Sequence, residues 1–208
     1  MGLDEALAAL PLIAILRGLR PDEAIAVTTA LFDAGFRIVE VPLNSPDPLV
    51  SIERIAVRFG ERMLVGAGTV LDEEAVTALE RVGAKLIVSP NFDPRVVRST
   101  KEKGLVSMPG VATPSEAFAA LAAGADAIKL FPAEMIAPSV VRSMRAVLPR
   151  HAKLIPVGGI ALPNILAYRD AGADAFGIGS ALYKRGLPVE KLGTIAEEFA
   201  KLCTRGLQ

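Results

Sequence analysis

The sequence contains very little cysteine and histidine. Its 208 residues include one cysteine, Cys203, and one histidine, His151. A single cysteine forms no disulfide within the chain, which predicts a reducing, cytoplasmic location. We interpret Cys203 as a small apolar residue of a terminal helix. A lone histidine does not make a histidine-rich metal site, so a carboxylate is the natural candidate for a general base.

The chain also has no excess of charge and no long apolar run. Lys plus Arg and Asp plus Glu both number 23, so the formal net charge is zero. Such a balance gives no general attraction for nucleic acid or acidic membranes. No apolar stretch approaches the roughly 20 residues of a membrane span. The acidic beginning, with Asp4 and Glu5, is unlike the basic start of a signal peptide. We therefore expect neither a nucleic acid nor a membrane as partner.

Apolar residues are abundant, at 51% of the chain, and the mean hydropathy is +0.43. These values predict elements that are buried on most sides. The length favours one domain, and no linker or low-complexity segment divides it. We therefore predict a single domain over residues 1–208.

Short apolar runs alternate with amphipathic helical stretches along the whole chain. The runs are nearly continuous, which is typical of parallel strands buried on both faces. There are eight of them: Leu12–Leu16, Ile38–Leu43, Leu64–Gly68, Leu86–Ser89, Leu105–Met108, Ala127–Phe131, Leu154–Val157 and Ala175–Ile178. Eight strands, each followed by a helical stretch, predict an α/β fold of the (β/α)8 TIM-barrel type.

Glycines and prolines mark the predicted helix boundaries. Left-handed glycines are expected to end helices at Gly35, Gly60, Gly83, Gly104, Gly124 and Gly172. The segment Thr113-Pro-Ser-Glu116 predicts a capping box with proline at the first helical position. Further helix starts are expected at Pro21, Pro94, Pro138 and Pro163.

Active sites of TIM barrels lie at the carboxyl ends of the strands, so polar residues there are candidates. Lys129 lies inside the sixth apolar run, where loss of hydration favours a neutral, nucleophilic amine able to form a Schiff base. The alternative is a lysine that extends to the rim or pairs with a carboxylate. Lys85 and Lys153 open their strands and should lie at the opposite end of the barrel.

Glu40 lies inside the second apolar run, where a carboxylate is equally hard to explain as packing. It could move protons beside an imine, with a pKa set by burial and by the lysine. The alternative is a buried ion pair without chemistry.

Four further features follow strands one, three, seven and eight, one after each strand. Arg17 and Thr69 suit a substrate carboxylate, because a guanidinium fork matches two oxygens; Arg17 could equally be a rim cation. Glycine turns follow the last two strands, where TIM barrels commonly hold phosphate on backbone N–H groups. The alternative is that they are tight turns only. The turns are Val157-Gly-Gly-Ile160 and Gly177-Ile-Gly-Ser-Ala181.

With these features in place, the chain resembles the KDPG/KHG aldolases, class I aldolases of keto-deoxy-phosphosugar acids, over essentially its whole length. The motifs that carry the resemblance are Pro11-Leu-Ile-Ala-Ile-Leu-Arg-Gly18, Glu40-Val-Pro-Leu-Asn-Ser-Pro46, Gly66-Ala-Gly-Thr-Val70, Ser89-Pro-Asn91, Pro109-Gly110, Ile128-Lys-Leu-Phe-Pro132 and Val157-Gly-Gly-Ile160. The resemblance implies that Lys129 forms the Schiff base and that Glu40 shuttles the proton. It further implies a homotrimer, no metal and no cofactor. The implied substrate contacts are Thr69, Pro90 and Phe131 for the carbonyl and carboxylate, and Gly158, Gly159, Gly179 and Ser180 for the phosphate.

Within this family, gluconate-type enzymes have an arginine where this chain has Asn44, and that arginine holds the pyruvyl carboxylate. Arg17 could supply the missing charge from the neighbouring strand. This combination is similar to members that cleave the galactonate-derived substrate, 2-dehydro-3-deoxy-6-phosphogalactonate, into pyruvate and glyceraldehyde 3-phosphate. A gluconate-type or KHG substrate remains an alternative.

Two other classes of function stay open. A metal-free phosphosugar isomerase, epimerase or lyase would share the phosphate cradle, but its Lys129 would only bind charge. A non-catalytic sugar-phosphate binding protein would bind without turnover. The pairing of Lys129 with Glu40 argues against the latter, because buried charges at a barrel mouth are costly without a use.

Overall fold

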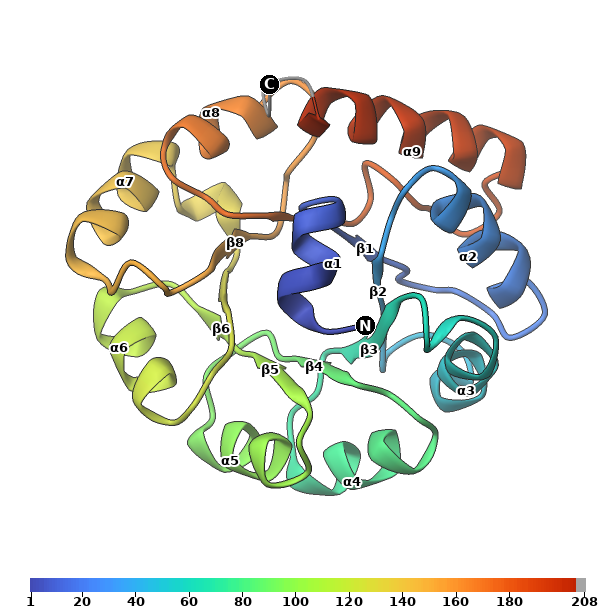
Figure 1. Cartoon of the computed structure of the whole chain (residues 1–208), viewed down its shortest axis with the longest axis horizontal. Helices are drawn as coiled ribbons and strands as arrows, with labels where there is room; N and C mark the ends of the chain where they lie inside the picture. The colour runs from blue at the N-terminus through green and yellow to red at the C-terminus, as the bar shows by residue number, and fades with distance from the viewer. Residues whose placement is uncertain (205–208) are drawn as a thin grey trace.

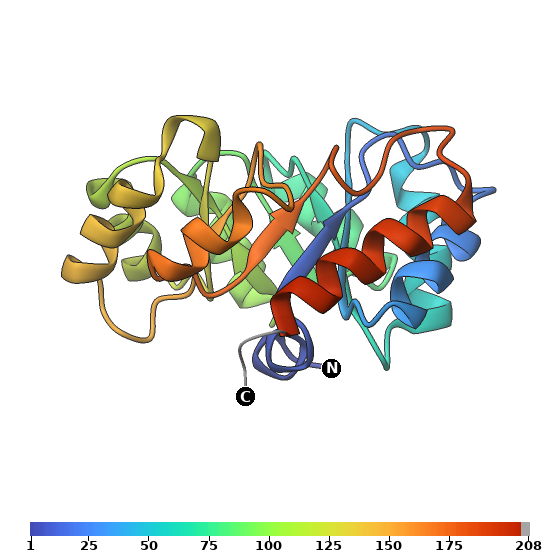
Figure 2. The same ribbon diagram turned by 90° about the horizontal axis from the view of Figure 1, so that it is seen from above.

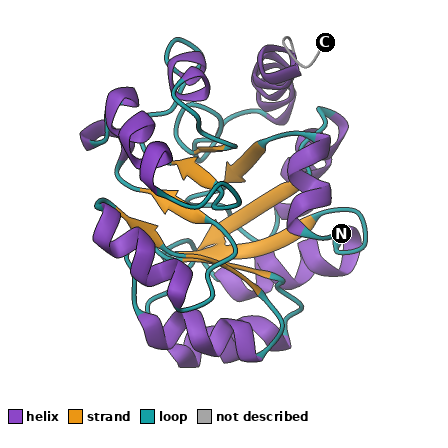
Figure 3. Ribbon diagram, turned by 60° about the vertical axis from the view of Figure 1, so that its left-hand side comes forward, coloured by secondary structure: helices purple, strands orange, loops and turns teal. Residues whose placement is uncertain are grey.

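The computed structural model describes residues 1–204 and forms an α/β fold with parallel strands inside a ring of helices (Figure 1, Figure 3). The strands are β1 Leu12–Ile15, β2 Ile38–Pro42, β3 Leu64–Gly68, β4 Leu86–Val88, β5 Val106–Met108, β6 Gly110–Val111, β7 Ile128–Leu130, β8 Leu154–Pro156 and β9 Phe176–Ile178. The helices are α1 Leu3–Ala9, α2 Ala24–Asp33, α3 Pro48–Phe59, α4 Glu73–Arg81, α5 Pro94–Glu102, α6 Pro114–Ala122, α7 Pro138–Val147, α8 Ile165–Asp170 and α9 Val189–Thr204, with a short 3-10 turn, η1, over Ala133–Met135.

The strands form two parallel sheets that curl around a common interior. One has six strands in the order β5-β4-β3-β2-β1-β9, and the other has the order β6-β7-β8. The break between β5 and β6 is a single residue, Pro109, whose carbonyl accepts a hydrogen bond from the Lys129 N–H. At the other edge, a bridge joins Val157 to Gly177, and the Asp174 N–H donates to the Leu154 carbonyl over 2.9 Å.

Two apolar layers follow from the alternation of side chains along each strand. One layer lies between the strands and the helices and includes Val39, Val65 and Ile128. The other fills the interior of the curled sheet. It includes Ile13, Ile38, Leu64, Leu86, Val88, Met108, Ala127, Ile155 and Ala175.

Helix α1, which the sequence analysis did not predict, covers one end of this interior. Its Leu3 and Ala6 belong to the inner apolar layer. Figure 1 shows the helix over the centre of the ring, and Figure 2 shows it on one side of the strands. Lys153, just before β8, pairs with Asp4 of α1 over 2.8 Å. Helix α1 therefore covers the amino ends of the strands and leaves the carboxyl ends as the accessible mouth.

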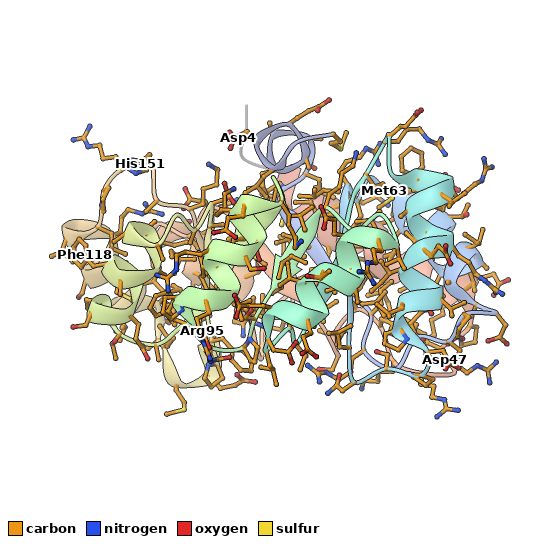
Figure 4. All side chains as sticks on the ribbon, turned by 90° about the horizontal axis from the view of Figure 1, so that it is seen from below. Asp4, Asp47, Met63, Arg95, Phe118 and His151 are labelled. Carbon is orange, nitrogen blue, oxygen red and sulfur yellow. The ribbon has the colours of Figure 1, made fainter. Side chains whose placement is uncertain are left out.

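The side chains marked in Figure 4 illustrate this polarity. Asp4, Met63 and His151 lie at one end of the molecule, whereas Asp47 and Arg95 lie at the other. Met63 and His151 precede strands, and Asp47 and Arg95 follow them. His151 therefore lies at the end away from the strand termini where the site was predicted.

The predicted helix boundaries hold with three corrections. Pro21 and Pro163 do not begin helices; each lies within a turn, and α2 and α8 start at Ala24 and Ile165. Side chains hold these turns, because Glu23 accepts from the Arg20 N–H and Asn164 from the Ala161 N–H. Gly60 ends α3 with φ of −58°, a right-handed conformation. The other five predicted glycines have φ between 69° and 101°.

Within residues 1–204, no helix has both the length and the apolar character needed to cross a membrane.

Candidate active site

A single cavity of about 390 Å³ brings together nine of the ten predicted site residues. It opens where the strands end. The nine are Arg17, Glu40, Thr69, Lys129, Phe131, Gly158, Gly159, Gly179 and Ser180. Pro90 is not among the lining residues. It lies in the loop after β4, where its carbonyl packs against Gly110.

Lys129 projects into the interior from the middle of β7. Its side chain lies on the same face as that of Ala127, two residues earlier, which belongs to the inner apolar layer. It is 6% exposed, and Nζ lies 4.5 Å from the centroid of the Phe131 ring. Burial lowers the pKa of the Lys129 amine; the Glu40 carboxylate opposes this shift and Arg17 adds to it. This shift increases the neutral, nucleophilic fraction of the amine at a given pH.

Glu40 reaches the same interior from β2, two residues after Ile38 of the inner layer. The residue is 2% exposed, and burial raises the pKa of its carboxyl from 4.5 to about 7, against the attraction of Lys129 and Arg17. Within residues 1–204, Oε2 has no hydrogen-bond partner, and no ion pair joins Glu40 to a cation. The buried ion pair considered as the alternative is thus not formed. An acid with a pKa near neutrality suits proton transfer in both directions.

Arg17 enters the cavity from the loop after β1. A hydrogen bond of 2.9 Å from the Gly18 N–H to Ser45 Oγ ties this loop to the one after β2. Asn44 lies on that second loop, is exposed, and does not line the cavity. Because the two loops are joined, Arg17 places a guanidinium near the position that Asn44 occupies. A second guanidinium of the cavity, that of Arg185, belongs to a residue whose Cβ lies beside Gly18. Thr69 lies at the end of β3 with φ of 59°, an uncommon value for a residue with a side chain.

The two glycine turns lie side by side on the cavity wall. Gly158 and Gly159 have φ of 102° and 67°, and a Cβ on Gly158 would lie 3.3 Å from the Ala133 nitrogen. After β9, the N–H groups of Leu182 and Tyr183 both donate to the Gly179 carbonyl. That bonding makes a single helical turn, whose first N–H groups have no partner inside the turn. Both features are suited to an anion such as a phosphate.

Sequence reasoning missed three charged residues that line the cavity: Glu134, Lys184 and Arg185. Glu134 packs over the turn of Gly158 and Gly159 from η1. Lys184 and Arg185 follow the last glycine turn, and Tyr183 fixes this segment through a 3.0 Å hydrogen bond from its hydroxyl to Glu23. All three residues follow a strand end by four to seven positions, so a wider search after each strand would have found them. The cavity also has an apolar lining, formed by Ile15, Val157 and Ile160. In the sequence these residues cannot be distinguished from core residues.

These groups together offer an amine with a lowered pKa, an acid with a pKa near 7, a guanidinium and two anion-binding turns. Such a set is able to form an imine with a ketone that carries a carboxylate and a phosphate. Within residues 1–204, no group of three or more His, Cys, Asp or Glu side chains is arranged to hold a metal ion.

Comparisons with known proteins agree with this chemistry. A family model described as KDPG and KHG aldolase matches residues 3–196. A probable 2-dehydro-3-deoxy-6-phosphogalactonate aldolase of Rhizobium meliloti (strain 1021) is 50% identical over 177 residues, which is 85% of this chain and 84% of that protein. The 2-dehydro-3-deoxy-6-phosphogalactonate aldolase of Escherichia coli (strain K12) is 46% identical and covers 96% of this chain and 97% of its own. A solved structure described as native KDPGal superimposes with a TM-score of 0.91 at 47% identity, covering 93% of this chain and 94% of the other. The chain belongs to the KDPG and KHG aldolase family.

Proposed function

We propose that this protein is a class I aldolase that cleaves 2-dehydro-3-deoxy-6-phospho-D-galactonate into pyruvate and D-glyceraldehyde 3-phosphate, in D-galactonate breakdown. The observation that carries the proposal is the pairing of Lys129 with Glu40 in one cavity, both buried and not joined as an ion pair. A lysine kept only to bind charge would gain from pairing with that carboxylate. A lysine that must attack a carbonyl gains from remaining neutral.

The reaction follows from the positions of these groups. The neutral Lys129 amine attacks the C2 ketone to form a carbinolamine. The carbinolamine takes up one proton from the solution and loses water, which leaves a protonated imine. The Glu40 carboxylate takes the C4 hydroxyl proton, directly or through a water, while the C3–C4 bond breaks and its electrons enter the imine. Glyceraldehyde 3-phosphate leaves, and an enamine remains on Lys129. Glu40 returns its proton to C3, which gives the protonated imine of pyruvate, and hydrolysis releases pyruvate, the free amine and one proton.

The remaining site residues bind the two ends of the substrate. Arg17 and Thr69 hold the pyruvyl carboxylate and carbonyl, beside the Phe131 ring. Gly158, Gly159, Gly179 and Ser180 hold the phosphate. Pro90 acts through the backbone of its loop, since it does not line the cavity.

The galactonate-derived substrate is favoured by the names of the two relatives at 46% and 50% identity and by Arg17 standing near Asn44. A KDPG or KHG substrate is the alternative within the family. An isomerase or epimerase, or a non-catalytic binding protein, would leave the lowered pKa of Lys129 without a use.

We infer further that the two sheets act as one closed (β/α)8 barrel, and that residues 1–208 form one domain. The backbone bonds across Pro109 and between β8 and β9 support closure. A homotrimer and a cytoplasmic location remain predictions. Analytical ultracentrifugation tests the trimer, with an expected mass about three times the 21.8 kDa of one chain.

Borohydride reduction in the presence of pyruvate tests the Schiff base. Mass spectrometry should find one adduct, on Lys129, and Lys129→Ala should lose both the adduct and cleavage while staying folded. Lys85→Ala and Lys153→Ala are matched controls and should retain both, because neither residue lines the cavity. An adduct on another lysine, or an active Lys129→Ala, would refute the assignment.

A cleavage assay with the galactonate- and gluconate-derived substrates, run side by side, tests the substrate. The galactonate-derived compound should be cleaved at least as well as the other. Cleavage of the gluconate-derived compound alone would refute the substrate and leave the aldolase class intact.

A further inference from the structure

The carboxyl group of Glu40 occupies space that exists only because residue 68 is a glycine. A Cβ placed on Gly68 would lie 2.5 Å from Cδ and 2.6 Å from Oε1 of Glu40, and closer still to Oε2. Carbon atoms that are not bonded to each other stay about 3.5 Å or more apart. No side chain is therefore compatible with residue 68 while Glu40 keeps its present conformation.

The neighbouring strands make this contact possible. β2 pairs with β3 in parallel, with Pro42 opposite Gly68, and the Leu43 N–H donates to the Gly68 carbonyl over 2.8 Å. The bare backbone of Gly68 thus forms one wall of a niche for the carboxyl of Glu40. Within residues 1–204, no protein group donates a hydrogen bond to Oε2, so its contact with the Gly68 backbone, and not a bond to another residue, limits where this oxygen lies.

The niche keeps the carboxyl apart from the cations that face it. These are Lys129 from β7 and Arg17 from the loop after β1. Neither forms an ion pair with Glu40 in the part of the chain that the structure describes. If the carboxylate moved out of the niche, the open direction would be the cavity, toward Lys129.

We propose that Gly68 is a positioning residue, which holds the Glu40 carboxyl in a buried niche and so prevents it from pairing with Lys129. The proposal rests on the function proposed above. Gly68 touches no reacting atom; it acts by where it allows Glu40 to lie.

The variant Gly68→Ala tests the proposal, because the clash is with the end of a flexible side chain that has a cavity to move into. We expect kcat for cleavage to fall by about a hundredfold, the scale for a misplaced catalytic group. KM should change little. The final yield of the pyruvate adduct trapped by borohydride should equal that of the wild type. The acidic limb of the pH profile of cleavage should move to lower pH, because the carboxylate moves closer to the cationic Lys129. Wild-type kcat with an unchanged pH profile would overturn the proposal.

A double-variant cycle separates positioning from general damage. Shortening the side chain with Glu40→Asp withdraws the carboxylate by one carbon and makes room for a methyl group at residue 68. Gly68→Ala should therefore cost much less activity in the Glu40→Asp protein than in the wild type. Equal costs in the two backgrounds would mean that the two residues are not coupled, which also overturns the proposal.

Whether the variants fold provides a further test of the proposal. If Gly68→Ala alone does not fold, Gly68→Ala combined with Glu40→Ala should fold, because the crowded atoms are gone. Failure of both proteins to fold would place the clash elsewhere and refute the niche.

Two other glycines serve as controls. A Cβ on Gly66, in the same strand, would lie 2.5 Å from Leu86 Cβ and 2.7 Å from its carbonyl carbon, so Gly66→Ala should lose folding and every activity together. A Cβ on Gly193 meets nothing within 4 Å, so Gly193→Ala should match the wild type. A wild-type protein that forms no imine would refute the proposed function. An active wild type with a fully active Gly68→Ala would refute only the role of Gly68.

Discussion

Lys129 and Glu40 illustrate how burial produces reactivity in single residues. Each belongs to the inner face of a strand on which the other side chains are apolar. Desolvation disfavours both charges, so the pKa of the amine falls and the pKa of the acid rises. Their opposite charges attract and limit both shifts. An ion pair would weaken the nucleophile and the base together, so keeping the two groups apart favours the reaction.

Glu40→Gln should separate proton transfer from imine formation. The amide keeps the shape but accepts no proton, so cleavage should fall by roughly a hundredfold or more while borohydride still traps pyruvate on Lys129. In the wild type, kcat/KM for cleavage should rise with pH through about 7, because the base must be ionised and its pKa is raised to about 7. Residual cleavage by Glu40→Gln should not show this rise with pH. Wild-type cleavage by Glu40→Gln would remove Glu40 from the mechanism.

Arg17→Lys should weaken binding of pyruvate and substrate. A guanidinium binds a carboxylate through two parallel hydrogen bonds, and an ammonium does not reproduce that fork. Inhibition by inorganic phosphate should stay nearly the same, because the glycine turns that would hold phosphate lie elsewhere on the cavity wall. Isothermal titration with pyruvate and phosphate measures the two effects separately. Arg20→Lys is the matched control, since Arg20 pairs with Asp22 and does not line the cavity. Normal pyruvate affinity in Arg17→Lys would refute the proposal that Arg17 replaces the arginine missing at Asn44.

At the scale of helices and strands, the sequence predicted what depends on local pattern. The eight apolar runs contain all the strands except β6, which begins after Pro109, a residue without an N–H for the ladder. Helix α1 was missed because it is only seven residues long and precedes the first apolar run, so the repeating pattern of strand and helix does not include it. The niche at Gly68 depends on the register between β2 and β3, which sequence periodicity does not specify. For the same reason, the sequence identified Lys129 and Glu40 as candidates but could not give their separation.

The capping box of α6 is a local pattern whose energy is measurable. Thr113 Oγ1 accepts from the Glu116 N–H, and Glu116 Oε2 accepts from the Thr113 N–H over 2.9 Å. Thr113→Ala should lower the free energy of unfolding by about 1 kcal/mol, the usual cost of losing an N-cap side chain. Urea denaturation measures this change. Thr113→Ser should preserve stability, and activity should be unchanged in both variants because Thr113 lies outside the cavity. A Thr113→Ala protein as stable as the wild type would mean that the cap contributes nothing.

For the whole molecule, apolar packing in the interior stabilises the fold, whereas the site requires polar groups to be buried in that same interior. The interior enclosed by the two sheets buries Ile38 and Ala127, and it also buries Glu40 and Lys129, which lie two residues further along the chain. Helix α1 covers the amino ends, so apolar packing at that end supports the structure while the carboxyl ends carry the polar groups. Burying these polar groups lowers the free energy of unfolding of the whole protein.

That cost should appear as a pH dependence of stability. The pKa of Glu40 is about 7 in the folded protein and near its ordinary 4.5 when unfolded, so the folded state binds more protons between these values. Stability should therefore fall as the pH rises through this window, by roughly 3 kcal/mol for a shift of this size. Glu40→Gln removes the buried charge. Its free energy of unfolding should exceed that of the wild type at pH 8, and the difference should shrink toward zero near pH 5.

Urea denaturation of both proteins at pH 5 and pH 8 measures this difference. Glu134→Gln is the matched control, because it replaces an exposed carboxylate at the mouth of the same cavity and leaves the buried Glu40 in place. Lys129 and Arg17 face Glu40, and both lose its attraction in Glu40→Gln, which reduces the stability gained at pH 8 by removing the buried charge. A stability difference between Glu40→Gln and the wild type that is the same at both pH values would mean that Glu40 is not held as a raised-pKa acid. The fold would then carry no electrostatic cost for its proposed proton shuttle.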